Sequence, residues 1–347
     1  MKKLVESLVE SLIDLDEFGD IPRIRMDQEK YNSKYCYDSE IDQPFWEFVI
    51  DKKSGAPCSL KSGSVKYIDL NTTTFTAPPR SFYNFAGKCY ELKTFILGSD
   101  WDLSRLRNTM YMFDNCKKLE NIEFPINWKE TKLKNVEWMF NGCNSLEKID
   151  LSNVDFSNVE TAAGMFSDCY KLEDINFGNS KWNHLTNISC MFFGCDKLKK
   201  IDLTNVSNGN PSVFHDTIRD PFWLCHNLET IDGELDFSYL SFYEMDNMFC
   251  ECSKLRNVNI KNIKYNPDIS KSDSNDGKIT LKNIQNLSKS SIDYLFKNMG
   301  NGKDHRGDQL TIIVSKKWVK TVGEKKIKDY KDLLAQKNWI LEISDWF

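Results

Sequence analysis

A block of apolar residues recurs along the middle of the chain at a nearly constant interval. Its clearest copy runs through Met139, Phe140, Cys143 and Leu146 to the alternating segment 149–151. The copies are anchored on cysteines that lie 26, 27 or 30 residues apart: Cys89, Cys116, Cys143, Cys169, Cys195, Cys225 and Cys252. A fixed interval in the twenties indicates a repeat architecture, in which each unit packs against its neighbours.

Two periodicities within each block predict a short helix followed by a short strand. Leu133, Val136, Phe140 and Cys143 are spaced by three or four residues, as on one face of a helix. The alternation Ile149-Asp150-Leu151 then has the period of a strand. We therefore expect an α/β, leucine-rich-repeat-like solenoid of helix-strand units, with one parallel sheet on one face, the helices on the other side and capping segments at both ends.

The two ends of the chain depart from the repeat. Residues 1–79 open with an amphipathic stripe (Leu4, Val5, Leu8, Val9, Leu12 and Ile13) and continue into an aromatic segment that we expect to cap the first unit. So short a helix must dock, either on this chain or in self-association or on another partner. The repeats occupy 80–262, a loop is expected at 263–277, and residues 278–347 predict degenerate repeats and a C-terminal cap, with a final helix and strand.

The repeated string LKNVEWMFNGCNSLEKIDLSNVDFSNVETAAGMFSDCYKLEDINF, residues 133–177, resembles the BspA-like leucine-rich repeats of bacterial surface proteins. The resemblance extends over residues 80–262, and the tail is similar to the ends of such arrays in tailed-phage structural proteins. It implies the repeat fold and an interaction role, and it supplies no active-site residue.

Composition narrows the function classes. A net charge of −5 disfavours a nucleic-acid partner. No window approaches 18 consecutive apolar residues, so no membrane insertion is expected. Glu6 and Glu10 interrupt the apolar run that a secretory signal needs. These features favour a cytoplasmic or virion protein.

The candidate chemistry of the chain is sparse. Each repeat cysteine follows a core Phe by three residues, so we expect it to be buried and reduced, and neither disulfide-bonded nor metal-bound. The pairs Cys225-His226 and His215-Asp216 stand without any nucleophile motif or phosphate loop. The sequence therefore predicts no enzyme activity, no cofactor and no metal site.

Two surfaces are candidates for partner binding. One outward position of each strand forms a polar column: Glu123, Asp150, Asn176, Asp202, Asp232 and Asn259. This column is either a solvated ladder that pairs with itself or a contact surface. The longest interval contains an insertion in 206–221 that holds Asn208, Asn210 and Phe214, and such loops often lie on a binding side. We expect a non-enzymatic scaffold that binds a protein or glycan, as a phage or bacterial structural or adhesion protein; the alternative is a cytoplasmic protein–protein interaction module.

Overall fold

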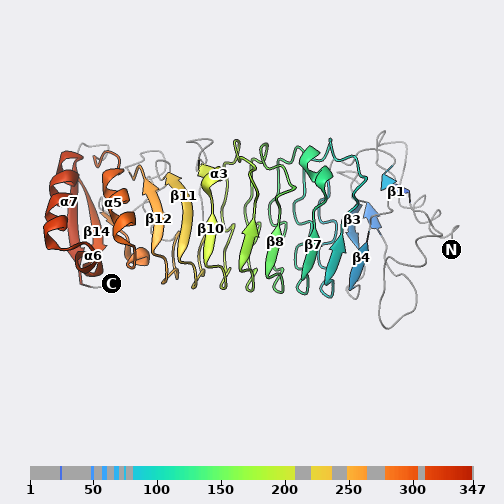
Figure 1. Ribbon diagram of the computed structural model, residues 1–347, viewed down its shortest axis with the longest axis horizontal. Coiled ribbons are helices and arrows are strands. Elements are labelled where there is room, and N and C mark those ends of the chain that lie inside the picture. The colour runs from blue at the N-terminus through green and yellow to red at the C-terminus, as the bar shows by residue number, and fades with distance from the viewer. Residues whose placement is uncertain are drawn as a thin grey trace.

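The computed structural model describes residues 81–207, 220–236, 248–263, 278–303 and 309–345. Nearer the N-terminus it describes only the backbone of short segments, at 24–25, 48–50, 57–60, 67–69 and 74–75, together with Lys66. The amphipathic start, the aromatic segment, nearly all of the 263–277 loop and Asn208, Asn210 and Phe214 lie outside the described residues. The described units lie side by side along the long axis of the molecule (Figure 1).

The strands of successive units pair in parallel, as the alternating pattern predicts. In chain order they are β4 (Tyr67–Asp69), β6 (Thr94–Ile96), β7 (Asn121–Glu123), β8 (Lys148–Asp150), β9 (Asp174–Asn176), β10 (Lys200–Asp202), β11 (Thr230–Asp236) and β12 (Asn257–Lys261). They form the sheets β4-β6-β7, β8-β9 and β10-β11-β12. Two antiparallel pairs precede them, β1 (Ile24–Arg25) with β5 (Thr74–Phe75) and β2 (Phe48–Ile50) with β3 (Pro57–Leu60). The result is a mixed α/β fold of small parallel sheets, consistent with a leucine-rich-repeat-like fold.

The predicted helix within each unit is wrong. The segment that carries Met-Phe and Cys is a series of tight turns, which we call the turn segment, at 81–90, 108–117, 135–144, 161–170 and 187–196, with further parts at 220–226 and 248–253. Two residues of each complete turn segment have positive φ, such as Trp138 (54°) and Gly142 (68°). Left-handed residues interrupt a right-handed helix, while consecutive turns bury apolar residues at similar intervals of three or four. The spacing alone could not separate the two structures.

Backbone hydrogen bonds explain the regularity of the turn segments. Within a unit, N–H groups bond three residues back, as Cys143 does to the Phe140 carbonyl at 3.1 Å. Between units, N–H groups at alternate positions donate to the next unit: Phe140 to the Met165 carbonyl at 2.9 Å, and Gly142 to that of Ser167 at 2.8 Å. The same direction holds from Phe82 to Leu224. Every such N–H points toward the C-terminal neighbour.

Asparagine starts several turn segments. Asn108, Asn135 and Asn187 lie in a line of parallel bridges with Ser81 and Thr161. The side-chain oxygen of each of these three asparagines accepts the backbone N–H two residues later at 2.9 Å. This is the local side-chain turn that Asn favours, and it accounts for part of the asparagine content of the chain.

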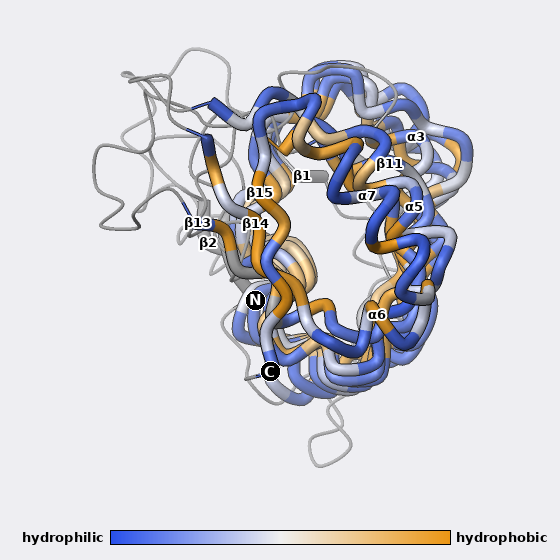
Figure 2. The backbone as a smooth tube through the Cα atoms, turned by 90° about the vertical axis from the view of Figure 1, so that its left-hand side faces the viewer, coloured by the Kyte–Doolittle hydropathy of each residue, from blue (hydrophilic) through white to orange (hydrophobic). Residues whose placement is uncertain are grey.

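The core is a set of columns that run through the units. The phenylalanines that stand three residues before the repeat cysteines stack from unit to unit, with ring centroids 5.5–5.9 Å apart and planes within 8° of parallel: Phe113, Phe140, Phe166, Phe192, Phe222 and Phe249. The seven repeat cysteines are buried and free, as predicted. In cross-section the units overlay one another along the long axis (Figure 2).

In the C-terminal part of the chain, a helix takes the position that a strand occupies in each repeat unit. Helix α5 (Lys289–Lys297) takes the place beside β12, where Ser288 N–H donates to the Arg256 carbonyl at 2.7 Å. Strands β13 (Lys278–Thr280), β14 (Leu310–Ser315) and β15 (Trp339–Ser344) form a separate parallel sheet. Figure 2 shows β14 and β15 on the opposite side of the section from α5 and α7. Thus α5 and α7 lie on the strand side of the array, where α5 packs beside β12.

The remaining helices are short except for the last. They are the 3-10 helices η2 (Ile126–Glu130) and η4 (Lys282–Ile284), and helices α3 (Thr204–Ser207), α6 (Lys316–Val322) and α7 (Glu324–Gln336). Ile327, Tyr330 and Leu334 of α7 are buried, as the predicted final helix requires. Helix α7 lies at the end of the long axis opposite β4 (Figure 1). Among the described residues, no helix is long and apolar enough to cross a membrane.

Candidate binding surface

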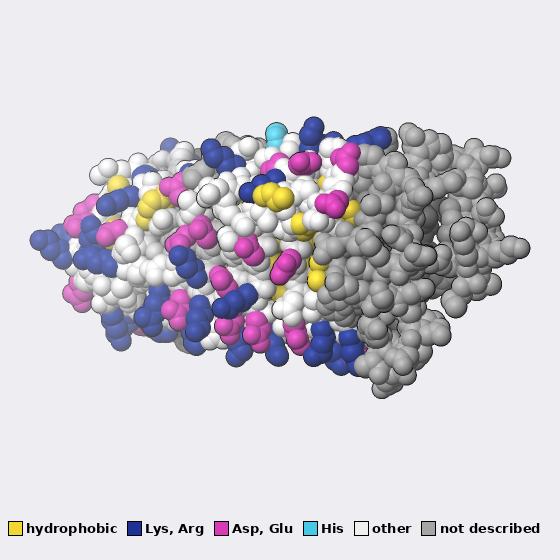
Figure 3. Space-filling model, turned by 45° about the vertical axis from the view of Figure 1, so that its right-hand side comes forward, with side chains coloured by type: hydrophobic (Ala, Val, Ile, Leu, Met, Phe, Trp, Pro, Cys, Tyr) yellow, Lys and Arg dark blue, Asp and Glu magenta, His cyan; other side chains and the backbone are white. Residues whose placement is uncertain are grey.

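The predicted polar column is present on the strand side of the array. Glu123, Asp150, Asn176 and Asp202 are exposed, and Asp232 and Asn259 are half-buried. Strand register places Asp150 beside Asn176 and Asp202 beside Asp232. On the face seen in Figure 3, basic and acidic side chains are interspersed, with few apolar ones.

A β-bulge breaks the column at its C-terminal end. The register of β11 and β12 shifts between Ile231 and Glu234, so Asn259 lies opposite Glu234, not Asp232. Gly233 has φ +101°, and a Cβ there would lie 2.8 Å from the Leu203 backbone. Glycine is therefore required for this bulge. The predicted continuation of the row from Asp232 to Asn259 is wrong, because the strict alternation ends at the bulge.

Glu234, which the sequence analysis missed, occupies the position in the polar column beside Asn259. Its carboxylate accepts hydrogen bonds from Lys261 Nζ, at 2.7 Å, and from the Tyr294 hydroxyl. These bonds, that of Lys261 first, lower the pKa of Glu234. The Asp-Gly pair that precedes Glu234 was a readable signal for the bulge.

The side chains of the column are largely satisfied within the array. Asp150 Oδ1 accepts the Ser152 N–H at 2.9 Å and the Asn176 Nδ2 at 3.1 Å. Asp202 Oδ1 accepts the Thr204 N–H at 2.9 Å, and its hydrogen bonds to Thr204 lower the pKa of Asp202. These contacts agree with a ladder that pairs with itself.

Charge is neutralised along the same surface. Lys200 Nζ lies 2.7 Å from an Asp232 carboxylate oxygen. Hydrogen bonding to Asp232 raises the pKa of Lys200 and keeps the cation in place. Both side chains are well exposed, so the pair contributes little to stability, but it lowers the net charge that a partner would meet on this column.

The cysteine column has no reactive thiol. Each Sγ from Cys116 onward lies near a backbone carbonyl of the preceding unit; for Cys143 this is Phe113 O at 3.3 Å and for Cys252 it is Phe222 O at 2.9 Å. Burial raises the pKa of the Cys89 and Cys225 thiols to about 12. A thiol that stays protonated at neutral pH is a poor nucleophile and a poor metal ligand. No group of three or more metal-ligating side chains occurs among the described residues.

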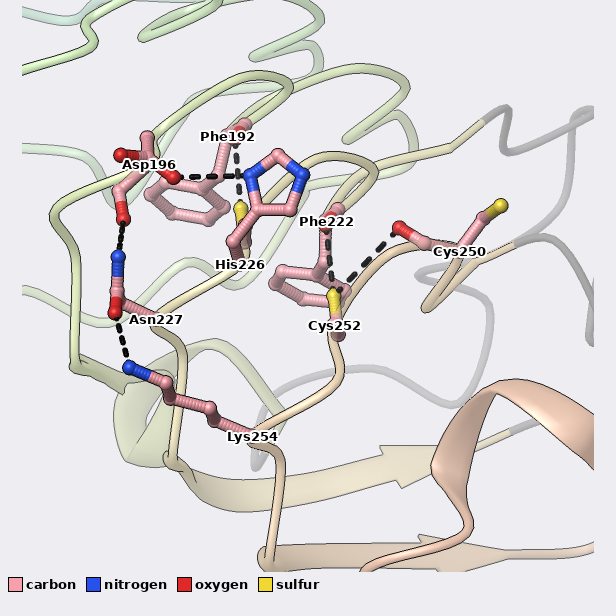
Figure 4. A network of polar contacts seen from close by, with 9 residues as sticks. Phe192, Asp196, Phe222, His226, Asn227, Cys250, Cys252 and Lys254 are labelled. Carbon is pink, nitrogen blue, oxygen red and sulfur yellow. Dashed lines mark hydrogen bonds and ion pairs between the residues drawn. The ribbon is translucent and has the colours of Figure 1, made fainter.

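Cys225 and His226 do not form a catalytic pair. Cys225 is buried with its Sγ 3.1 Å from the Phe192 carbonyl, whereas the His226 Nδ1 lies 2.9 Å from Asp196 Oδ1 on the surface. Figure 4 shows His226 directed toward Asp196, within a chain of contacts that continues through Asn227 to Lys254. This network links three neighbouring units. His215 and Asp216 lie outside the described residues.

The turn side of the array differs from the strand side because it exposes aromatic residues. Tyr83, Tyr111 and Trp138 belong to consecutive turn segments and are half-buried; we call them the first aromatic cluster. The rings of Tyr83 and Tyr111 meet edge to face at 5.9 Å. No hydrogen bond of the Tyr83 and Tyr111 hydroxyls or of the Trp138 indole N–H is found within the described part of the chain.

A second aromatic cluster lies farther along the turn side. Its members are Tyr170, Phe193 and Trp223, of which Tyr170 is 47% and Trp223 37% exposed. The rings of Phe193 and Trp223 meet edge to face at 5.7 Å. Trp and Tyr present large rigid contact areas with a polar tip, and for this reason they dominate protein interfaces.

The backbone beneath the first cluster is strained. Tyr111 and Trp138 have φ of 59° and 54° at the position that Gly164 occupies in the next unit. Left-handed backbone costs a side-chain-bearing residue about 1 kcal/mol or more. A Cβ at Gly164 would lie 2.2 Å from the Trp138 ring, so the indole covers Gly164. Sequence reasoning missed this position because it has no apolar periodicity, although Tyr111 and Trp138 stand directly before the Met-Phe pairs.

A family model matches part of the array. The family model described as "Mycoplasma protein of unknown function, DUF285" matches residues 81–206. No curated protein matches the chain. Among solved structures, the chain is similar to a leucine-rich repeat protein from Bacteroides ovatus ATCC 8483, with 13% identity over 90% of this chain and 99% of that chain, and a TM-score of 0.22. At so low a TM-score, the fold rests on the strand pairing and stacking described above.

Proposed function

We propose that the chain is a leucine-rich-repeat-like solenoid whose function is to bind a protein or glycan, without catalysis. Its units satisfy many of their polar groups from one unit to the next, and the repeat thiols from Cys116 onward lie against backbone carbonyls. What the array offers to other molecules is an extended surface.

The observation that carries the proposal is the pair Tyr111 and Trp138 in left-handed backbone. Gly164 shows that glycine fits this position without strain. The equivalent residues Asn84, Cys190 and Asp220 are also left-handed, so the turn itself imposes this strain. What distinguishes Tyr111 and Trp138 is that large aromatic side chains lie partly exposed there, as at protein interfaces. We therefore place the main contact on the turn side, and we retain the strand-side column and Asn208, Asn210 and Phe214 as the competing surfaces.

The cellular setting stays open between two proposals. A bacterial adhesion or structural role follows the resemblance to surface-protein repeats, and neither match reported above concerns a phage protein. A cytoplasmic protein–protein interaction module is the second proposal. Mass spectrometry of surface, cytosolic and virion fractions from the source would separate these settings.

The binding test compares two surface variants of the whole chain. Tyr111→Gly with Trp138→Gly removes two of the three members of the first aromatic cluster by a residue that suits their left-handed backbone. Asp150→Lys with Asp202→Lys alters the strand-side column. Each is used as immobilised bait against fractionated source proteins and against a glycan array, beside the unaltered chain. We expect the aromatic variant to lose at least tenfold in affinity for whichever ligand is captured.

Two results would overturn this assignment. Loss of binding confined to the strand-side variant would transfer the contact to the polar column. Unchanged binding in both variants would show that neither surface contacts the ligand. Circular dichroism of each variant must match that of the unaltered chain, so that loss of fold is not mistaken for loss of contact.

A further inference from the structure

The second aromatic cluster lies among polar groups whose formal charges cancel. Three consecutive units contribute the ends of their turn segments, at 167–171, 193–197 and 223–227. The charged side chains in these segments are two half-buried aspartates and two exposed lysines: Asp168, Asp196, Lys171 and Lys197. With His226 neutral, the formal charges of the three segments sum to zero.

One ring of the cluster is held beside a carboxylate. The Tyr170 hydroxyl donates to Asp168 Oδ1 at 2.9 Å. Both side chains lie against Gly194 of the next unit, where a Cβ would stand 2.9 Å from Asp168 Oδ1 and 3.4 Å from Tyr170 Cε1. The ring and the carboxylate are therefore positioned together by contacts within the chain.

A second carboxylate follows in the next unit. Asp196 stands directly after its repeat cysteine, as Tyr170 does one unit earlier and His226 one unit later. The Oδ1 atom of Asp196 lies 2.9 Å from His226 Nδ1, and its backbone carbonyl accepts the Asn227 Nδ2 at 2.7 Å (Figure 4). Tyr170, Asp196 and His226 thus form one row along the array.

A row of rings runs next to this polar row. Phe193 and Trp223 stand two residues before their repeat cysteines, and their rings meet edge to face at 5.7 Å. Gly194, between the two rows, donates its N–H to the Trp223 carbonyl at 2.8 Å. Partly exposed aromatic rings and carboxylates therefore lie side by side on one part of the turn side.

This composition favours a neutral, hydroxyl-rich ligand. A charged ligand would meet as many like charges as opposite ones, so charge gives it no net attraction. The buried centres of protein interfaces are depleted of Asp and Lys, whereas here these residues stand among the rings. A sugar has an apolar ring face that can pack on an aromatic side chain. Its hydroxyls can donate to carboxylates in charge-assisted hydrogen bonds.

We propose that the second aromatic cluster, together with Asp168, Asp196 and His226, binds a neutral oligosaccharide. Tyr170 and Trp223 supply the stacking surfaces, and the two carboxylates accept hydroxyl groups. At about 4.8 Å per unit, the two rings lie roughly 10 Å apart along the array, a distance that an oligosaccharide spans and a single sugar does not. The inference rests on the proposed binding function and names the ligand class of a site separate from the first aromatic cluster.

The test measures binding of neutral oligosaccharides to the full-length protein. An array of sugars built from glucose, galactose, mannose, xylose and N-acetylglucosamine selects the probe, and isothermal titration calorimetry gives its affinity. Tyr170→Ala and Trp223→Ala should each weaken binding at least tenfold. The matched control is Tyr90→Ala, because Tyr90 also follows a repeat cysteine and is 43% exposed but lies outside the cluster. It should bind like the unaltered chain.

Asp168→Asn tests the carboxylate separately from the rings. Asn tolerates the left-handed backbone of Asp168, which has φ 58°, so the variant keeps the turn. Because a hydrogen bond to a charged acceptor is lost, affinity for the sugar should fall about tenfold. Circular dichroism of every variant must match that of the unaltered chain.

Four results would overturn the inference. Equal affinity of the Tyr170 and Tyr90 variants would exclude this cluster. Sugar binding that is lost only in the variant with Tyr111→Gly and Trp138→Gly would move the ligand to the first aromatic cluster and leave the proposed function intact. Binding of charged glycans alone would exclude a neutral ligand. No binding of neutral sugars at millimolar concentration would also end the inference, while capture of a protein through the first aromatic cluster would still support the proposed function.

Discussion

Left-handed residues determine where each unit turns, and they differ in how closely their neighbours approach. Gly164 has φ +62° and lies under the Trp138 ring, while Gly323 has φ +90° and no atom within 4 Å of the position of its Cβ. A side chain at position 164 would therefore meet both an unfavourable left-handed backbone and a steric overlap with Trp138. A side chain at position 323 would meet the unfavourable backbone alone.

Replacing Gly164 by alanine should lower the free energy of unfolding by about 2–4 kcal/mol, because strain and overpacking add. Gly323→Ala is the matched control; it meets the backbone strain without the overlap and should cost less, about 1–2 kcal/mol. Urea unfolding followed by circular dichroism measures both values. Equal losses would mean that Trp138 does not pack on Gly164.

The buried thiols predict a stability that falls at alkaline pH. Burial raises the pKa of all seven repeat cysteines, to about 12 for Cys89 and Cys225. Since the thiol of the unfolded chain ionises near its ordinary pKa of about 8.5, the folded state binds more protons above that pH. Stability is complete below that value and declines up to the folded pKa, by about 1.4 kcal/mol per pH unit for each thiol.

Cys169→Ala offers the internal comparison for this pH effect. The variant should be less stable at pH 7 but should lose less stability between pH 8.5 and 10.5 than the unaltered chain, because one titrating thiol is gone. Urea unfolding across this range gives the slope. Parallel pH profiles for the two proteins would contradict the assignment of the slope to buried thiols.

At the scale of elements, the join between β12 and α5 depends on one hydroxyl. Ser291 is buried, and its Oγ accepts the Val258 N–H of β12 at 3.0 Å. Ser291→Ala would leave this N–H buried without a partner and should cost about 1–3 kcal/mol. Ser290→Ala, next to it on the exposed side, should cost less than about 0.5 kcal/mol. Thermal unfolding of the two variants distinguishes a specific bond from a general effect of losing serine on this helix.

The strands were predictable from sequence and the turn segments were not. Alternation at Ile149-Asp150-Leu151 has a single structural meaning, and the structure confirms it. Intervals of three and four, by contrast, fit both a helix and consecutive turns. The deciding signal was the residue before four of the seven repeat cysteines, where Asn115, Gly142, Asp168 and Gly194 are of the types that tolerate left-handed backbone.

The candidate surface was also predictable only in part. The polar column followed from strand alternation, so Asp150, Asn176 and Asp202 are found where expected. The bulge at Gly233 shifts the register of β11 against β12, so Glu234 and not Asp232 lies beside Asn259. A bulge inserts residues into a strand, and the alternation of apolar and polar residues does not predict where this happens. The aromatic clusters depend on which side of a turn a residue faces, and this requires knowledge of the turn geometry itself.

At the scale of the whole molecule, the C-terminal part should be needed to close the array. Deleting residues 278–347 would uncover β12 and the buried side chains of Val258, Ile260 and Ile263. We expect a lower melting temperature and binding of an apolar dye, because a terminal repeat without its cap exposes core. Deleting residues 1–14 is the comparison and should leave the melting temperature of the array unchanged. Calorimetry and dye fluorescence would contradict this account if removal of the cap had no effect.

The one-way hydrogen bonds of the turn segments give the array an electrical direction. Peptide groups such as that of Phe140 point their N–H toward the C-terminal neighbour and their carbonyl toward the preceding unit, so their dipoles add along the long axis as they do along an α-helix. Parallel strands add little, because their dipoles nearly cancel. The turn segments therefore contribute a dipole along the long axis that is positive toward α7 and negative toward β4.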